Sequence, residues 1–220
     1  MTSPWSRPSE RPAVPPPRPV EDARVLRETP WPAAPQAPGL HTAPAPLRPG
    51  AAFLFSHPAH AIALGFGSGL APRAPGTVGT LWAWVSFLVL DPWLGAAAPA
   101  GWAAALLAGT LIGIWACTRT AQHLGTADPG AIVWDEVLGF WLVLWVLTPA
   151  PWWAQGVAFA LFRVFDAVKR GPVGWADRRY KRRSGQAIGW PQGWGILFDD
   201  LVAAGMTLLT MALVLRLWTW

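Results

Sequence analysis

The stretch Ile132-Val-Trp-Asp-Glu-Val-Leu-Gly139 places two adjacent carboxylates, Asp135 and Glu136, at the edge of the apolar run Val137–Leu147. A run this apolar suits the interior of a membrane, where ionised side chains are costly. Acids persist there only when a charged partner, water or a metal ion compensates them. The fold must therefore supply a partner for both acids.

Two further apolar runs carry acids at their ends. Asp166 closes the run Val157–Phe165, and Asp199-Asp200 open the run Leu201–Leu215. Carboxylates with no histidine or cysteine ligand nearby favour a hard cation, Mg2+. We predict that the chain folds to gather all five acids beside one Mg2+ ion, which would polarise a phosphoryl group and activate water.

The composition indicates a membrane protein. Only 13% of the 220 residues are charged, against roughly 25% in ordinary soluble domains, and 53% are hydrophobic. The 17 tryptophans and the mean hydropathy of +0.30 favour a polytopic chain with indole rings at the water–lipid boundary. The net charge of +5 suits an anionic membrane surface or an anionic substrate. Basic residues are not interleaved with stacking aromatics, so we expect no nucleic-acid partner.

Five apolar runs predict membrane helices, at 78–90, 102–117, 137–149, 152–165 and 200–217. Most are shorter than the ~20 residues that span a bilayer, so four helices remain an alternative. We predict an all-α fold, a polytopic membrane helical bundle of about four to five apolar helices, with turns at Asp91-Pro92 and at 149–151. With a cytoplasmic N-terminus, five crossings place the acids and the basic loop after Asp166 at the inner face, in agreement with the positive-inside rule.

The N-terminal segment differs from the rest of the chain. Residues 1–50 hold 14 of the 24 prolines, and such a segment cannot bury enough apolar area to offset its ordering entropy. We predict a disordered Pro-rich tail over 1–50 and a helical membrane domain over 51–220. No apolar segment follows the first basic residues, so the tail is not a signal peptide.

A glycine-rich segment precedes the first apolar run, at Gly65-Phe-Gly-Ser-Gly-Leu-Ala-Pro-Arg-Ala-Pro-Gly-Thr-Val-Gly-Thr80. Its glycines and prolines exclude a continuous helix or strand. Thr77 can cap the helix that begins after it, and a helix N-terminus that follows a glycine-rich turn suits a phosphate group. Two interpretations remain open on composition, a structural turn and an anion-binding loop.

The spacing of the charged residues sets limits on their roles. Adjacent helical residues point about 100° apart, so Asp135 and Glu136 cannot share one face. One can bind the metal while the other orients it or takes a proton from water. Arg163, Asp166 and Lys169 are spaced at intervals of three, which puts a carboxylate between two cations along one stripe. This stripe is either a helix-end salt bridge or part of a phosphate site.

Four blocks occur in this order: Gly65–Thr80, Ile132–Gly139, Phe162-Arg-Val-Phe-Asp-Ala-Val-Lys169, and Gly193-Trp-Gly-Ile-Leu-Phe-Asp-Asp200. Together they resemble the phosphatidylglycerophosphatase A family. The resemblance implies an all-helical, Mg2+-dependent enzyme of the bacterial inner membrane, with its active site on the cytoplasmic face. Its substrate would be the membrane phospholipid phosphatidylglycerophosphate, hydrolysed to phosphatidylglycerol and phosphate.

The resemblance and the charge pattern together assign expected roles. The expected catalytic residues are Asp135, Glu136, Asp166 and Asp200. The expected metal ligands are Asp135, Glu136, Asp166, Asp199 and Asp200. The expected phosphate-binding residues are Gly76, Thr77, Arg163 and Lys169. Either water or an Asp carboxylate can serve as the nucleophile.

Two other classes of protein fit parts of the pattern. A small membrane transporter or channel would line an ion path with its acids, and would spread them across the depth of the membrane. A non-catalytic membrane scaffold would leave the acid pairs without mutual contact.

Overall fold

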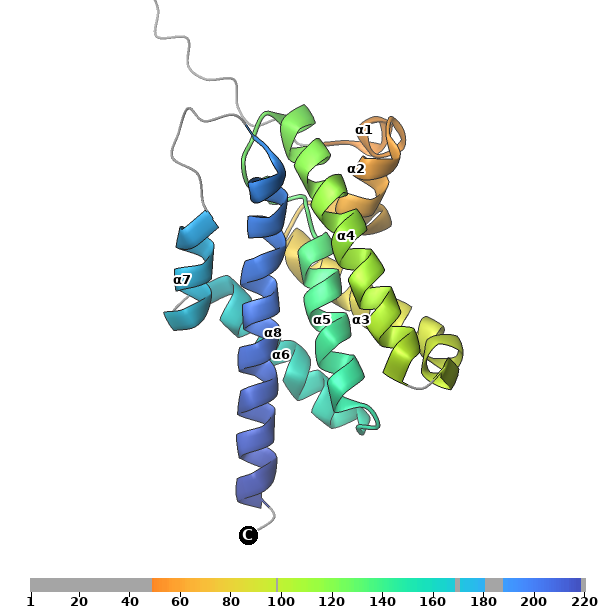
Figure 1. Ribbon diagram of the computed structural model, residues 1–220, viewed down its shortest axis with the longest axis vertical. Coiled ribbons are helices and arrows are strands. Elements are labelled where there is room, and N and C mark those ends of the chain that lie inside the picture. Colours follow the sequence, from red (N-terminus) through yellow and green to blue (C-terminus); the bar gives the residue numbers. More distant parts are fainter. Residues whose placement is uncertain (1–48, 98, 169–170, 181–187, 219–220) are drawn as a thin grey trace, which may run out of the picture. The chain divides into compact units, whose positions relative to one another are not determined.

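The computed structural model describes residues 49–97, 99–168, 171–180 and 188–218 (Figure 1). These residues belong to one unit, Pro44–Trp220. The predicted tail, except for its last two residues, lies outside the described residues, and so does Lys169. The elements in order are α1 (Ala51–Phe55), α2 (Pro58–Ala63), η2 (Gly65–Leu70), α3 (Pro75–Leu94), η3 (Gly95–Ala97), α4 (Pro99–Leu124), α5 (Trp134–Leu147), α6 (Trp152–Val168), α7 (Gly171–Tyr180) and α8 (Trp190–Trp218).

The described part of the chain is helical and contains no strand, as predicted. The five predicted apolar runs correspond to α3, α4, α5, α6 and α8. Three of these, α3, α4 and Trp190–Arg216 of α8, are long and apolar enough to cross a membrane. With 14 residues, α5 is only about 21 Å long, shorter than the ~30 Å hydrocarbon core.

Two predicted boundaries of α3 were wrong. The helix does not begin after Thr77: it begins at Pro75, and its N-cap is Ala74, with φ 47° and ψ 56° and no side-chain cap. Proline suits the first helical position because its φ is already helical and its missing N–H has no partner there in any helix. The helix also continues through Pro92 to Leu94. One proline removes one hydrogen bond without ending a membrane helix, because neighbouring groups can compensate.

The first turn of α5 is held against α4 by two glycines and one indole. Gly109 and Gly113 stand one turn apart on α4, and a Cβ on Gly113 would lie 2.5 Å from the Trp134 ring. The Trp134 indole N–H donates to the Gly109 carbonyl at 3.0 Å. Small residues four apart let membrane helices approach closely. This contact fixes the helical turn that carries Asp135.

On its other side, α5 packs against α8 and α6 (Figure 1). A Cβ on Gly139 of α5 would lie 3.1 Å from the backbone oxygen of Asp200 and 2.9 Å from the ring of Phe162. Phe162 is fully buried, as are Phe140 and Leu144 to within 1%. The bare glycine thus brings the Asp200 backbone of α8 up to α5.

Substitution at Gly113 tests the α4–α5 contact. Gly113→Ala should lower the free energy of unfolding by about 1–3 kcal/mol, because the new methyl group overlaps the packed Trp134 ring. Thermal unfolding in detergent micelles measures this loss.

The matched control is Gly205→Ala in α8, where a Cβ would meet nothing within 4 Å. That variant should keep the wild-type unfolding temperature or raise it, since alanine favours helix. Equal unfolding temperatures for the two variants would contradict the packing described here.

Candidate active site

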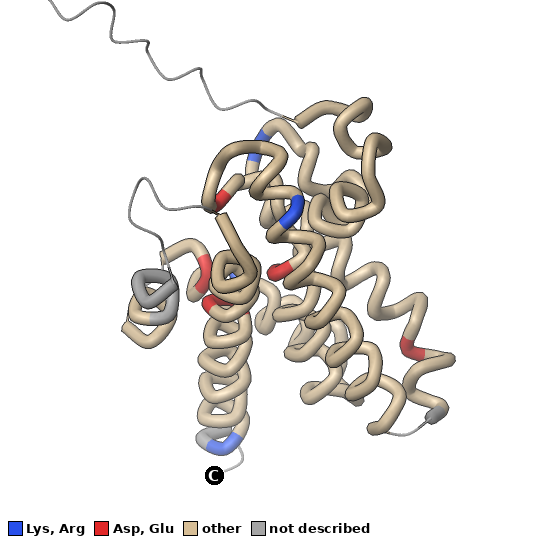
Figure 2. The backbone as a smooth tube through the Cα atoms, turned by 45° about the horizontal axis from the view of Figure 1, so that its top comes forward, with Lys and Arg blue, Asp and Glu red and all other residues tan. Residues whose placement is uncertain are grey.

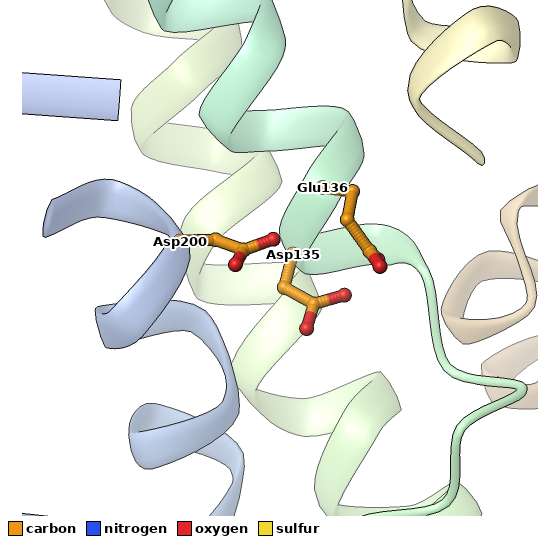
Figure 3. Close-up of side chains that lie close together, drawn as sticks. All are labelled: Asp135, Glu136 and Asp200. Carbon is orange, nitrogen blue, oxygen red and sulfur yellow. The ribbon is translucent and has the colours of Figure 1, made fainter. Parts of the chain in front are cut away.

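Three carboxylates from two helices form the centre of the site. Asp135 and Glu136 leave the first turn of α5, and Asp200 reaches toward them from α8 (Figure 3). One oxygen from each lies within 4.8 Å of the other two. Among the described residues, this is the group of three or more acids, histidines or cysteines with the spacing to hold a metal ion. The side chains of Asp135 and Glu136 leave the helix in different directions, but one carboxylate oxygen of each reaches the same centre.

Each of the three acids has an oxygen without a hydrogen bond. Asp135 Oδ1, Glu136 Oε2 and Asp200 Oδ2 are buried and accept no hydrogen bond from any described residue. Glu136 is 8% exposed and Asp200 is 2% exposed. Burying a carboxylate oxygen without a hydrogen-bond donor costs free energy, and a cation beside these three atoms would offset that cost.

Arg163 of α6 is the cation that the fold places beside these acids. Its Nη1 donates to Asp166 Oδ2 at 2.5 Å and lies 3.6 Å from Glu136 Oε1. Asp166 is 8% exposed, so the pair is largely removed from water. The predicted i, i+3 spacing of Arg163 and Asp166 is realised. Arg163 therefore joins Asp166 to the group of three carboxylates.

The formal charges at this site do not cancel. Among the described residues, the four carboxyl groups of Asp135, Glu136, Asp166 and Asp200 gather around one cationic group, the guanidinium of Arg163. Like charges repel more strongly in a buried site than in water. Figure 2 shows that acidic residues gather beside α8, while long parts of the helices carry no charge. A bound divalent cation would therefore offset the excess of carboxyl groups over cationic groups at this site.

Gly76 brings the first turn of α3 against the same charges. A Cβ there would overlap the Glu136 carboxylate and lie 3.0 Å from Arg163 Nη2. Gly76 is buried, and Thr77 is half-buried beside it. The N–H groups of a helix's first turn have no partner within the helix. The backbone N–H groups of Gly76 and Thr77 belong to this first turn, and Gly76 lies next to Arg163.

The remaining predicted residues have different positions. Asp199 is 5% exposed but is not a member of the group formed by Asp135, Glu136 and Asp200. It stands next to Asp200 on α8, and adjacent helical residues point about 100° apart. Lys169 lies outside the described residues.

Two positioning residues went unnoticed in the sequence. Trp134 anchors the first turn of α5 on α4, and Gly139 admits the Asp200 backbone to α5. The signal for Trp134 was available, because Gly109 and Gly113 form a Gly-x-x-x-Gly spacing in an apolar helix. Gly139 stands in the quoted acidic block itself, three residues after Glu136.

The fold and the site define a helical membrane protein with a buried acidic centre that is contacted by Arg163. The family model described as Phosphatidylglycerophosphatase A matches residues 61–215. The chain belongs to this family, whose members are phosphatases. The contacts among Asp135, Glu136 and Asp200 also contradict a scaffold whose acids do not meet.

Named relatives agree with the family match. The chain is 37% identical over 153 residues to Phosphatidylglycerophosphatase A of Escherichia coli, covering 67% of this chain and 78% of the relative. It is 36% identical over 148 residues to the Haemophilus influenzae protein of the same name, covering 67% and 83%. A Bacteroides thetaiotaomicron protein with the provisional description phosphatidylinositol-3-phosphatase is 35% identical over 158 residues, covering 69% and 89%. No solved structure matches the chain.

Substitution at Gly76 tests whether the α3 turn belongs to the site. Gly76→Ala puts a methyl group against the ends of two flexible side chains, Glu136 and Arg163. These ends can move at little cost in stability, but their displacement should lower phosphatase kcat about 100-fold. Phosphate release and thermal unfolding of the same purified preparation measure the two effects.

Gly130→Ala is the control, since a Cβ at Gly130 would meet nothing within 4 Å. Full activity in Gly76→Ala would separate the α3 turn from the site. A loss of activity that only follows unfolding would do the same.

Proposed function

We propose that the chain hydrolyses phosphatidylglycerophosphate to phosphatidylglycerol and phosphate, with Mg2+, at the cytoplasmic face of the bacterial inner membrane. The observation that carries this proposal is the group of buried oxygens from Asp135, Glu136 and Asp200 beside Arg163. The names of the relatives from Escherichia coli and Haemophilus influenzae support the choice of substrate.

The acidic centre fits Mg2+ by its chemistry. Its ligand atoms are all carboxylate oxygens, which hard cations prefer, and three of the oxygens are buried without a donor. Asp135, Glu136 and Asp200 would hold the ion. Asp199 is next to Asp200 in the sequence, and Asp166 is linked to Glu136 through Arg163. When bound, Mg2+ would polarise the phosphoryl group and offset its negative charge.

Phosphate binding falls to Arg163 and the first turn of α3. The Nε of Arg163 is buried and has no acceptor among the described residues. A guanidinium presents several N–H donors in one plane and suits phosphate oxygens. The N–H groups of Gly76 and Thr77 stand at a helix N-terminus, which favours an anion. Lys169 stays a further proposed phosphate ligand, outside the described residues.

The carboxylates supply the proton transfers. A carboxylate that is not bound to the metal can accept a proton from the attacking water. Among the acids of the centre, Glu136 also contacts Arg163. Asp166 holds the guanidinium in place through the 2.5 Å hydrogen bond. If an Asp carboxylate attacks phosphorus instead, borohydride should reduce the acyl phosphate that forms, releasing phosphate and converting the aspartate side chain to the alcohol of homoserine.

The substrate and the metal are tested by phosphate release from the purified protein in mixed micelles. Phosphatidylglycerophosphate with Mg2+ should release phosphate, and EDTA should abolish the release. Phosphatidylinositol 3-phosphate serves as the competing substrate, because one relative bears that description. A higher kcat/KM for phosphatidylinositol 3-phosphate, or full activity in EDTA, would overturn the proposal.

Asp200→Asn tests the acidic centre itself. Removing one carboxylate charge from the proposed metal site should lower kcat about 100-fold or more, with the protein still folded and inserted. The matched control is Asp91→Asn in α3, since Asp91 is not a member of the acidic centre and its Oδ1 accepts the Trp102 indole N–H. Near wild-type activity in Asp200→Asn would remove that residue from the site.

A further inference from the structure

Two histidines join the last turn of α4 to the short helix α2, which lies beside it (Figure 1). His60 Nε2 lies 2.7 Å from His123 Nδ1, and the two rings meet edge to face with their centroids 4.9 Å apart. His60 is 3% exposed, whereas His123 is exposed. The Thr120 hydroxyl also donates to the Ala59 carbonyl, at 3.2 Å, between the same two helices. We call His60 and His123 the histidine pair.

The neighbours of His60 determine which of its ring nitrogens carries the proton. Its Nδ1 lies 2.8 Å from the Phe53 carbonyl oxygen, which can only accept, so Nδ1 is the donor. The Ser56 hydroxyl donates to the same carbonyl, so its oxygen can also accept from His60 Nδ1, at 3.0 Å. In neutral His60 the Nε2 atom is therefore an acceptor, and the Nδ1–H of His123 donates the hydrogen bond within the pair.

The histidine pair can keep this hydrogen bond with one added proton but not with two. The Nε2 atom of His123 forms no hydrogen bond with a described residue and the side chain is exposed, so a first proton can bind there while Nδ1–H still donates. A second proton would have to bind Nε2 of His60. Two N–H groups would then point at each other, and two positively charged rings would be in contact. The second proton therefore breaks the hydrogen bond.

The surroundings of the histidine pair disfavour that second proton. His57 is a third imidazole there, with its ring centroid 5.4 Å from that of His60 and 5.7 Å from that of His123. On α4, Arg119 precedes His123 by four residues, and no described carboxylate forms an ion pair with any of the three rings. Burial lowers the pKa of His60 from its ordinary value of 6.5; the Phe53 carbonyl opposes this shift, and His123 and His57 add to it. The hydrogen bond is thus kept above pH 6.5 and is lost only as the pH falls below that value.

The histidine pair supports the helix on which the start of α5 rests. His60 stands three residues before Ala63, whose carbonyl oxygen accepts from the Val133 N–H at 2.9 Å. Val133 is fully buried and is the N-cap of α5, and Asp135 and Glu136 follow it in the first turn. A displacement of α2 away from α4 would therefore move the backbone that carries two acids of the centre.

We propose that the histidine pair positions the acidic centre for catalysis and releases it in acid, when a second proton breaks the hydrogen bond between His60 and His123. This assignment rests on the proposed function, because the reaction that it regulates is phosphate release at the acidic centre. His60 and His123 are positioning residues, since they act through α2 and Val133. The protein is then most active while the pair carries at most one added proton.

The pH dependence of phosphate release tests this role. The kcat for phosphatidylglycerophosphate, in mixed micelles with Mg2+, is measured for the wild type and for His123→Asn between about pH 8 and about pH 5, where imidazoles titrate. The asparagine amide can donate to neutral His60 and accept from protonated His60, so its hydrogen bond survives the second proton. The carboxyl groups of the acidic centre titrate in both proteins. On acidification, the wild-type kcat should therefore fall about 10-fold further than that of His123→Asn.

Two further variants separate positioning from other effects. His123→Ala removes the hydrogen bond at every pH, so its kcat should already be about 10-fold low at about pH 8 and should show no extra loss in acid. The matched control is His57→Asn, which can still accept the Ala59 N–H as an N-cap and leaves the histidine pair intact. It should keep the acid loss of the wild type. Thermal unfolding of each preparation checks that the variants are folded.

Selective 15N labelling of histidine gives a measurement that does not depend on activity. The chain has four histidines, so the spectrum contains four rings. Asparagine variants identify the signals of His57, of His123 and of His41, which lies outside the described residues, and the remaining signal belongs to His60. At neutral pH both rings of the pair should carry the Nδ1 proton. The His60 ring should become charged over the pH range in which the wild-type kcat falls.

Three outcomes overturn the assignment. Parallel acid losses in the wild type and His123→Asn would assign the loss to the acidic centre alone. Wild-type kinetics in His123→Ala would show that the pair positions nothing, and a charged His60 ring at a pH where kcat is undiminished would separate its protonation from activity. Each of these leaves phosphate release itself intact. Wild-type protein that releases no phosphate at any pH would instead refute the proposed function, and the positioning role with it.

Discussion

The structure depends on one electrostatic constraint: four carboxyl groups are brought together at a site where the described residues supply one guanidinium, that of Arg163. Arg163 contacts both Glu136 and Asp166, so a single side chain of α6 links the acids of two helices. One positive charge cannot balance four ionised carboxylates in a buried setting. The acids therefore outnumber the donors around them: three carboxylate oxygens of α5 and α8 accept no hydrogen bond from the described residues.

Maintaining this concentration of charge requires helices that approach one another closely. Glycine serves that purpose at each contact around the site: Gly113 admits the Trp134 ring, Gly139 admits the backbone of Asp200, and Gly76 admits Glu136 and Arg163. Apolar burial around them, for example of Phe140 and Phe162, supplies the dispersion contacts that hold membrane helices together. Packing thus offsets the repulsion that the site creates.

Much of the site followed from the sequence because acids are costly beside apolar runs. That argument singled out five acids, and oxygens of three of them, Asp135, Glu136 and Asp200, lie together. The i, i+3 spacing likewise indicated the contact between Arg163 and Asp166. What local pattern could not decide was which member of an adjacent pair faces the centre, since that depends on how α8 is rotated against α5. Asp199 was placed in the predicted metal set, but the group of close oxygens does not include it.

The ends of the elements were less predictable than their existence. Proline was taken as a break at Asp91-Pro92, but the helix continues to Leu94, and the start of α3 preceded Thr77 because Pro75 suits the first turn. The contact of Trp134 with Gly109 and the strained backbone of Phe66 are tertiary features. The first depends on an element distant in the sequence, and the second is a backbone conformation that propensity disfavours for a bulky residue.

The central claim is that carboxylates of α5 and α8 share one divalent cation. Electron paramagnetic resonance of Mn2+, which accepts the same oxygen ligands as Mg2+, tests it without reference to catalysis. Titration of the purified protein should show one bound Mn2+ per chain that Mg2+ displaces. Asp135→Asn, Glu136→Gln and Asp200→Asn should each weaken this binding by about 10-fold or more. Unchanged Mn2+ binding in all three variants would contradict the account.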